Sequence, residues 1–108
     1  MQFRIYQLPH NNNNIFRHFK EGTTIDLGDY CCVWHQEVAG AIGDEDKQLA
    51  RCEAIFAIFN INRPDTFGGH SLSVSDIVEL YDDEDEGHQE FYYCDAVGFK
   101  KVTSNVIH

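Results

Sequence analysis

The stretch from Phe59 to Leu80, FNINRPDTFGGHSLSVSDIVEL, decides the fold, because it joins a helical pattern to a strand pattern. The residue before Pro64 is pushed out of the helical region of backbone conformation. Gly68-Gly69 permits backbone angles that are closed to other residues, and the serine-rich run that follows offers hydroxyls to nearby backbone groups. An apolar run with β character begins at Ile77. The stretch is therefore predicted to be a connector from a helix to a sheet.

A helix is predicted upstream of this connector, from about Asp44 to Phe59. Asp44 stands at an N-cap position, and the acidic residues after it place negative charge in the first turn. Apolar side chains then recur at steps of three and four residues, at Leu49, Cys52, Ile55, Phe56 and Phe59. We expect this face to be buried against a sheet.

Five segments have strand character. Residues 3–8 alternate between apolar and polar side chains, and residues 30–38 are rich in β formers. In the second segment, residues 30, 32, 34 and 36 are expected on one face and residues 31, 33 and 35 on the other. Residues 77–81 and 91–96 are predicted to form a hairpin with its tip near Gly87 or His88, and residues 98–102 a short fifth strand.

Residues 11–22 leave two interpretations open. The asparagine run could cap a helix whose apolar face is Ile15, Phe16 and Phe19 and which stops at Gly22, or the segment could be a plain loop. With the helix, the order is β-α-β-α-β-β-β. The sequence then predicts one α+β domain over residues 1–108: a mostly antiparallel sheet of about five strands with two helices packed on one face.

Composition and charge restrict the classes of function. The chain has 108 residues, 43% of them hydrophobic, which is enough for one modest core. No apolar run approaches the roughly 18 residues of a membrane span, and the first residues do not resemble a secretory signal, so we expect a cytoplasmic protein with reduced cysteines. With 8 Lys and Arg against 18 Asp and Glu, the net charge of −10 argues against direct binding to nucleic acid or to an anionic membrane. A protein partner with a basic surface is the natural complement.

Two segments carry a resemblance to a known family. Residues 59–78, with Pro64 and the Phe67-Gly-Gly-His-Ser run, are similar to the central motif of YodL-like domains, and residues 92–102 resemble their C-terminal motif. The opening residues 3–8 also fit. The resemblance implies a single YodL-like domain from a bacterial mobile element, acting in the cytoplasm of the host cell. It supplies no catalytic residues, and it suggests a role against host defence, such as an anti-CRISPR role.

An acidic segment is the main candidate for partner binding. Between Pro64 and Phe99 there is no Lys or Arg, and the carboxylates are expected to form a negative field with no internal cation, as a DNA mimic would. The alternative is a solvated loop that keeps the protein soluble. The candidate residues are Asp76, Glu79, Asp82, Asp83, Glu84, Asp85, Glu86, Glu90 and Asp95.

A second set of residues is predicted to act in structure, fixing the connector through local hydrogen bonds. Its members are Gly68, Gly69, His70, Ser71, Ser73 and Asp76.

Metal binding and catalysis have weaker support in the sequence. The histidines and cysteines lack the paired spacing of a structural zinc site. Cys94-Asp95 with His70 or His88 could form a nucleophile and its base, but nothing in the sequence brings them together. We therefore expect no metal, no cofactor and no enzyme activity.

The sequence thus predicts a small acidic inhibitor that binds the basic nucleic-acid-binding surface of a host defence nuclease, with a CRISPR effector or its guide complex as the leading target. The alternative is a non-catalytic interaction or regulatory module of the conjugation or replication machinery of the mobile element.

Overall fold

A computed structural model describes residues 1–9, 11–12, 15, 24–38, 44–61, 72–82, 85–96 and 98–104 of the chain. These residues form one α-helix, α1 (Glu45–Ile61), a short 3-10 helix, η1 (Leu27–Asp29), and six strands. The strands are β1 (Gln2–Gln7), β2 (Thr24–Ile25), β3 (Cys31–Glu37), β4 (Ile77–Asp82), β5 (Asp85–Cys94) and β6 (Phe99–Ser104).

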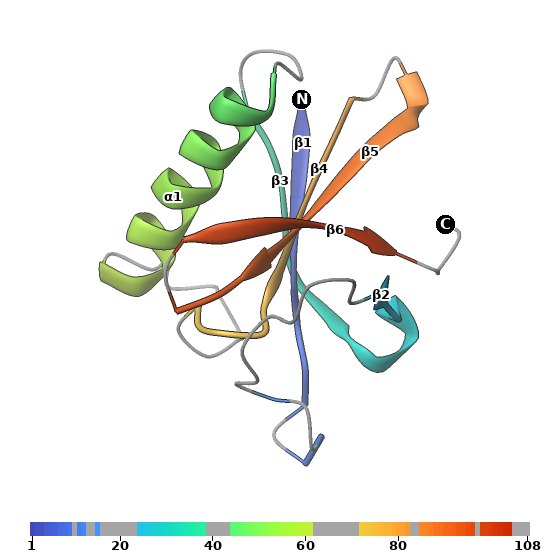
Figure 1. The fold of residues 1–108 in the computed structure, drawn as a ribbon, viewed down its shortest axis with the longest axis vertical. Helices are drawn as coiled ribbons and strands as arrows, with labels where there is room; N and C mark the ends of the chain where they lie inside the picture. The colour runs from blue at the N-terminus through green and yellow to red at the C-terminus, as the bar shows by residue number, and fades with distance from the viewer. Residues whose placement is uncertain are drawn as a thin grey trace.

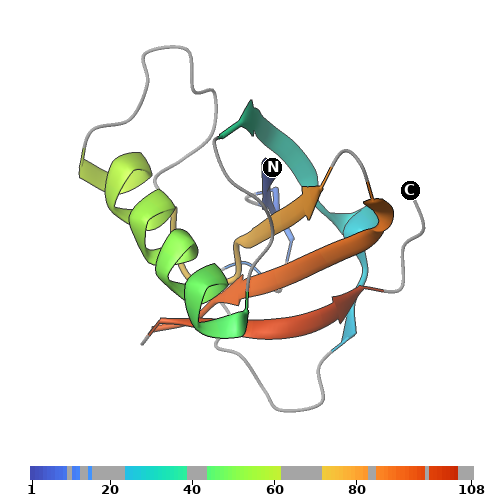
Figure 2. The same cartoon turned by 90° about the horizontal axis from the view of Figure 1, so that it is seen from above.

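The strands form one twisted sheet in the order β2-β6-β5-β4-β1-β3 (Figure 1). Every pairing is antiparallel except that of the two-residue β2 with β6. The helix α1 lies on one side of the sheet, and the segment from β2 through η1 lies on the other (Figure 2). The prediction of an α+β fold with a mostly antiparallel sheet is confirmed.

The helix count differs from the prediction. The described residues contain one α-helix rather than two. The segment proposed as a first helix falls mostly on residues 13–14 and 16–23, which lie outside the described residues. At the start of this segment the chain makes turns, with the Asn12 amide donating to the Pro9 carbonyl at 2.9 Å and the Ile15 amide to the Asn12 carbonyl at 3.2 Å.

The start of α1 and its buried face follow the sequence pattern. Asp44 Oδ1 accepts a hydrogen bond from the Lys47 amide at 2.9 Å, which is the capping bond predicted for that position. The helix buries Cys52, Ile55 and Phe59, while Leu49 and Phe56 are partly buried against the same core. The Phe59 ring meets the rings of Phe3 and Trp34 edge-on, with centroids 6.4 and 5.5 Å away. Edge-to-face contacts of this kind fix the helix across β1 and β3.

The opposite face of the sheet has an apolar core of its own. It consists of buried Tyr6, Leu27, Ile77, Phe91, Tyr93 and Val102, with Tyr30 packed against them. Leu27 belongs to η1, and Asp26 caps this element by accepting a hydrogen bond from the Gly28 amide at 2.9 Å. In the described part of the chain, apolar cores therefore lie on both faces of the sheet, with α1 on one face and the short η1 on the other.

A bulge in β3 overturns the predicted division of its faces. Ile5 lies opposite Trp34 and Tyr6 lies opposite Cys32, so Val33 is the extra residue. An extra residue reverses the alternation of side chains along a strand. Cys32 and His35 consequently share the face away from α1, whereas Trp34 shares the face of α1 with its partner Ile5.

The hairpin turn also differs from the prediction. The two strands are separated by residues 83–84, and β5 already begins at Asp85, so Gly87 and His88 lie within the strand rather than in the turn. Tyr81 pairs with Gln89 and Asp82 with Asp85, which leaves residues 86–88 in a bulge on β5. The glycine that suggests a turn in the sequence is accommodated in this bulge instead.

The described part of the chain holds no helix with the length and apolar character needed to cross a bilayer.

Candidate functional site

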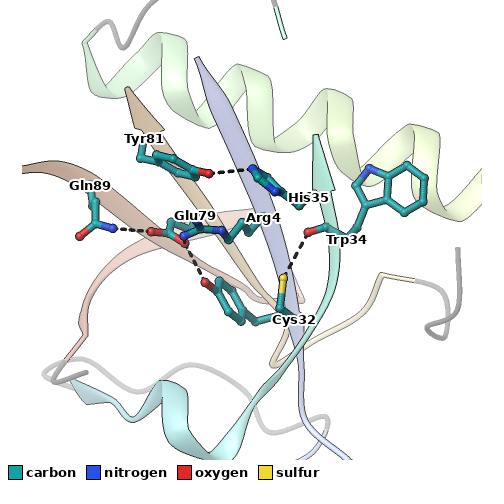
Figure 3. Close-up of polar contacts among 8 residues, drawn as sticks. Arg4, Cys32, Trp34, His35, Glu79, Tyr81 and Gln89 are labelled. Atoms are coloured by element: carbon teal, nitrogen blue, oxygen red, sulfur yellow. Dashed lines mark hydrogen bonds and ion pairs between the residues drawn. The ribbon is translucent and has the colours of Figure 1, made fainter. Parts of the chain in front are cut away.

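A buried carboxylate stabilises the part of the β4–β5 hairpin around Glu79 and Gln89, which we call the root of the hairpin. Glu79, on β4, is 0% exposed. Its Oε1 accepts hydrogen bonds from Arg4 Nη1 at 3.0 Å and from the Tyr6 hydroxyl at 2.8 Å, and its Oε2 accepts one from Gln89 Nε2 at 2.8 Å (Figure 3). The donors come from β1 on one side and from β5 on the other. Glu79 thus joins the three central strands beneath the hairpin tip.

Arg4 extends this network toward the surface. Its guanidinium carbon lies 4.4 Å from the centroid of the Tyr81 ring, a cation–π contact. The Tyr81 hydroxyl lies 2.7 Å from Nε2 of the exposed His35, and the two rings stack. These side chains gather on the face of the sheet away from α1 (Figure 3).

Two donors of this network, Arg4 and Tyr6, keep their protons near neutral pH. Burial lowers the pKa of Arg4, but the hydrogen bond and charge of Glu79 outweigh it, so the pKa lies above its ordinary value. Burial, reinforced by the bond to Glu79, raises the pKa of Tyr6. Both groups therefore keep their protons and remain donors to the carboxylate. The network is suited to holding strands together rather than to transferring protons.

A second buried carboxylate lies at the start of β4. Oδ2 of Asp76 accepts hydrogen bonds from the Ser73 amide at 2.8 Å and from Gln7 Nε2 at 3.0 Å. Its Oδ1 is buried and accepts no hydrogen bond from any described residue. Burial raises the pKa of Asp76 to about 7, although both hydrogen bonds oppose the rise. The adjacent Ser75 has a φ of +84°, and its carbonyl accepts a hydrogen bond from the Tyr30 hydroxyl at 2.9 Å.

A third feature had no counterpart in the sequence analysis. Among the described strands, β3 pairs only with β1, so its other edge faces outward. Beside this edge is a groove of about 400 Å³ between α1 and the ends of β1 and β3, lined largely by apolar side chains. Ile58 of α1 borders it and is 50% exposed. The helical pattern gave no sign that Ile58 is exposed, because the nearby apolar residues Ile55 and Phe59 are buried.

The sequence profile of the YodL-like domain matches residues 2–104, nearly the whole chain. The protein belongs to the YodL-like domain family. No curated protein and no solved structure matches it.

Three of the candidate partner-binding carboxylates of this YodL-like domain are buried. Asp76 and Glu79 are 0% exposed and Glu90 is 9% exposed, while Asp95 is partly buried. Glu90 Oε1 pairs with Lys101 Nζ at 2.9 Å, and Glu79 pairs with Arg4. The prediction of a field with no internal cation is therefore wrong, because β1 and β6 bring in cations from the two ends of the sequence.

The other five candidate carboxylates are consecutive in the sequence, from Asp82 to Glu86. Asp82 and Asp85 lie in β4 and β5 of the YodL-like domain, and Glu86 follows in β5. The placement of these three side chains, and of Asp83 and Glu84 altogether, lies outside the described residues.

The connector is described only at its end. Ser73 and Asp76 make the local bonds predicted for them: Asp76 Oδ2 accepts from the Ser73 amide, and the Asp76 amide donates to the Ser73 carbonyl at 3.1 Å. The donor is the Ser73 backbone rather than its hydroxyl. Gly68, Gly69, His70 and Ser71 lie outside the described residues.

The cysteine considered as a nucleophile is in the core of the YodL-like domain. Cys94 is 1% exposed, and burial raises its pKa to about 12, which suppresses the reactive thiolate. His70 and the side chain of His88 lie outside the described part of the chain. Within that part, no three His, Cys, Asp or Glu side chains are grouped so that they could hold a metal ion.

Proposed function

We propose that this YodL-like domain is a non-catalytic inhibitor that binds the basic, nucleic-acid-binding surface of a host defence nuclease through its acidic hairpin. An RNA-guided CRISPR effector is the target class we favour. The observation that carries the proposal is the position of the sequence Asp82-Asp-Glu-Asp-Glu86 at the end of a hairpin whose root is braced by the buried Glu79 network.

The bracing supports the proposal because it holds in place the two strands that the acidic run joins. A binding segment that is already ordered loses less conformational freedom when it meets its partner. Glu79 binds donors from both flanking strands, which holds the root of the hairpin in one geometry. A charged loop whose only role is solubility needs no such support.

The charge of the surrounding surface favours the same partner. The ion pairs at Glu79 and Glu90 use two of the eight cations and two of the eighteen carboxylates, so the remaining charges still sum to −10. Such a surface should steer a basic partner and speed its association, and salt should weaken this effect. The exposed acidic residues of the described part are Asp26, Asp29, Glu37, Asp44, Asp46 and Glu53, against the exposed lysines Lys47, Lys100 and Lys101.

The test measures binding of labelled DNA by purified RNA-guided nucleases and restriction endonucleases in a mobility-shift assay. Added wild-type domain should displace DNA from at least one nuclease, and displacement should weaken as salt rises. A variant with Asn or Gln at each position from Asp82 to Glu86 should lose this activity. Asp46→Asn with Glu53→Gln, which neutralises exposed charges on α1, should keep most of it.

Two results would contradict the proposal. One is inhibition that survives in the variant with the neutralised hairpin. The other is a lack of displacement across the whole panel, which would favour a role in the conjugation or replication machinery of a mobile element.

A further inference from the structure

We infer that the outer edge of β3, together with the groove beside α1, binds an extended basic segment of the partner protein as an added strand. One part of the inference, that the partner is basic, rests on the proposed function. It adds a second contact surface, separate from the acidic hairpin, and specifies which side chains the partner segment must carry.

The hydrogen-bond pattern of β3 shows which backbone groups face outward. The Val38 amide donates to the Met1 carbonyl at 2.9 Å, and the Met1 amino group donates to the Val38 carbonyl at 3.3 Å. In an antiparallel pair, such hydrogen-bonded positions alternate with positions whose N–H and C=O groups point away. His35 and Glu37 occupy these intervening positions, opposite Arg4 and Gln2. Their backbone groups are therefore directed to the open edge, where an extended peptide can pair with them.

The groove determines one side chain of that peptide. A residue of the added strand opposite Gln36 would point to the same face as Gln36, which is the face of α1. There it would enter the groove lined by Gln36, Val38, Ile58 and Phe59. Arg51 also lines the groove, and its guanidinium is held by Gln48 Oε1 and Met1 Sδ. The fixed positive charge disfavours a cation at this position, so the residue should be apolar.

The opposite face determines the neighbouring side chains. Glu37 is exposed, and its Oε2 accepts a hydrogen bond from Gln2 Nε2 at 3.0 Å. A Lys or Arg opposite Glu37 would form a cross-strand pair of opposite charge, which stabilises a sheet. Within β3 there is no Lys or Arg, and Glu37 is the acidic residue of the strand. An alternation of basic and apolar residues is therefore the pattern that this edge should select.

A second copy of the domain fits the edge less well. Two chains of net charge −10 repel each other, and each would bring its own Glu37 to the shared edge. The charge thus favours a basic segment of another protein as the occupant.

The test uses a short fluorescent peptide of alternating lysine and valine, with a peptide of alternating glutamate and valine as its control. Fluorescence anisotropy should detect binding of the lysine peptide only. Ile58→Asp, at an exposed position that borders the groove, should weaken binding by about tenfold or more. Ala57→Asp, at an exposed position on α1 that does not line the groove, should change it less than about twofold.

His35→Pro tests the edge itself. It removes an outward N–H group, which an edge strand tolerates, and it should weaken binding while circular dichroism shows an intact fold. The free domain should show rapid hydrogen exchange at the amides of His35 and Glu37, and the peptide should slow it. Slow exchange in the absence of the peptide, or a dimer in sedimentation that Ile58→Asp dissociates, would mean that another occupant already covers the edge and would overturn the inference. Equal binding of the glutamate peptide, or full binding by both Ile58→Asp and His35→Pro, would overturn it too.

The variant with the neutralised hairpin separates this inference from the proposed function. It should still bind the lysine peptide, because β3 lies at the far edge of the sheet from β6 and is separated from β4 by β1. Loss of peptide binding in that variant would assign the peptide to the hairpin and refute the edge site. Peptide binding without inhibition of any nuclease would refute the proposed function alone.

Discussion

Replacing Asp76 by Asn should make the domain more stable at pH 8 and less sensitive to pH. Asp76 is fully buried, and one of its oxygens accepts no hydrogen bond from the described residues. Burial of the charged form raises its pKa from the ordinary value of 3.8 to about 7. Asn keeps an oxygen that can accept from the Ser73 amide and from Gln7 Nε2, and it carries no charge at any pH.

The magnitude follows from proton linkage. Between about pH 4 and pH 7 the folded protein holds a proton on Asp76 that the unfolded chain has released, so stability falls as pH rises through this window. Each pKa unit corresponds to about 1.4 kcal/mol, which gives a penalty of about 4 kcal/mol once the pH exceeds 7. The buried amide N–H₂ of Asn would retain part of that penalty. We therefore expect a gain of about 2–4 kcal/mol at pH 8 and little change at pH 4.

The assay is urea unfolding of the wild type and of Asp76→Asn at pH 4, 6 and 8, followed by tryptophan fluorescence. Other carboxylates titrate in both proteins, so the difference between their free energies of unfolding isolates Asp76. Parallel pH profiles, or a variant that is less stable than the wild type at pH 8, would show that Asp76 is charged and stabilising in the fold and would refute the reasoning.

Three further substitutions test the packing and the bracing. Arg4→Met should lower the free energy of unfolding by about 3–5 kcal/mol in urea titrations, because it leaves Glu79 buried without its cation; a loss below about 1 kcal/mol would contradict this. Phe59→Ala should cost about 3–5 kcal/mol by cavity formation, whereas the half-exposed Ile58→Ala should cost much less, and equal losses would contradict the assigned helix face. Gly98→Ala should lower thermal stability by about 1 kcal/mol or more, because Gly98 has a φ of +74°; an unchanged melting temperature would mean that the turn tolerates a side chain.

The helix and most of the strands could be predicted from the sequence because their signals are local. The N-cap at Asp44 and the spacing from Leu49 to Phe59 lie within one helix, and alternation marks residues 3–8 as a strand. A bulge becomes visible only when a strand is paired with its neighbour. The bulge in β3 depends on its pairing with β1, and no local sequence pattern reports that pairing. For that reason the sequence placed Trp34 correctly on a strand and on the same face as Gln36, but it wrongly placed Cys32 on that face too.

The candidate site was less predictable, because buried carboxylates resemble exposed ones in a sequence. Glu79 and Glu90 stood in an apparently uniform acidic segment, yet each pairs with a cation from outside it. Alternation with the apolar residues of β4 placed Glu79 on a predicted strand, whereas Glu90 lay just before the strand predicted over residues 91–96. Only the neighbouring strands could show that both carboxylates are buried. The position of β3 at the edge of the sheet could likewise not be predicted from the sequence, since strand order is a property of the whole sheet.

The position of β1 between β4 and β3 has a consequence for folding during synthesis on the ribosome. β1 pairs with β4, and the ion pair between them joins residues 75 positions apart. At about 5–20 residues per second, a ribosome takes about 4–15 s to make the intervening chain, and during that time β1 has no β4 to pair with. Contacts between residues so far apart in the sequence also slow the folding of the completed chain. The edge of β1 that pairs with β4 therefore stays without its partner strand for seconds, although β3 is already available to the other edge. During that time chaperones and proteases can reach the unpaired edge.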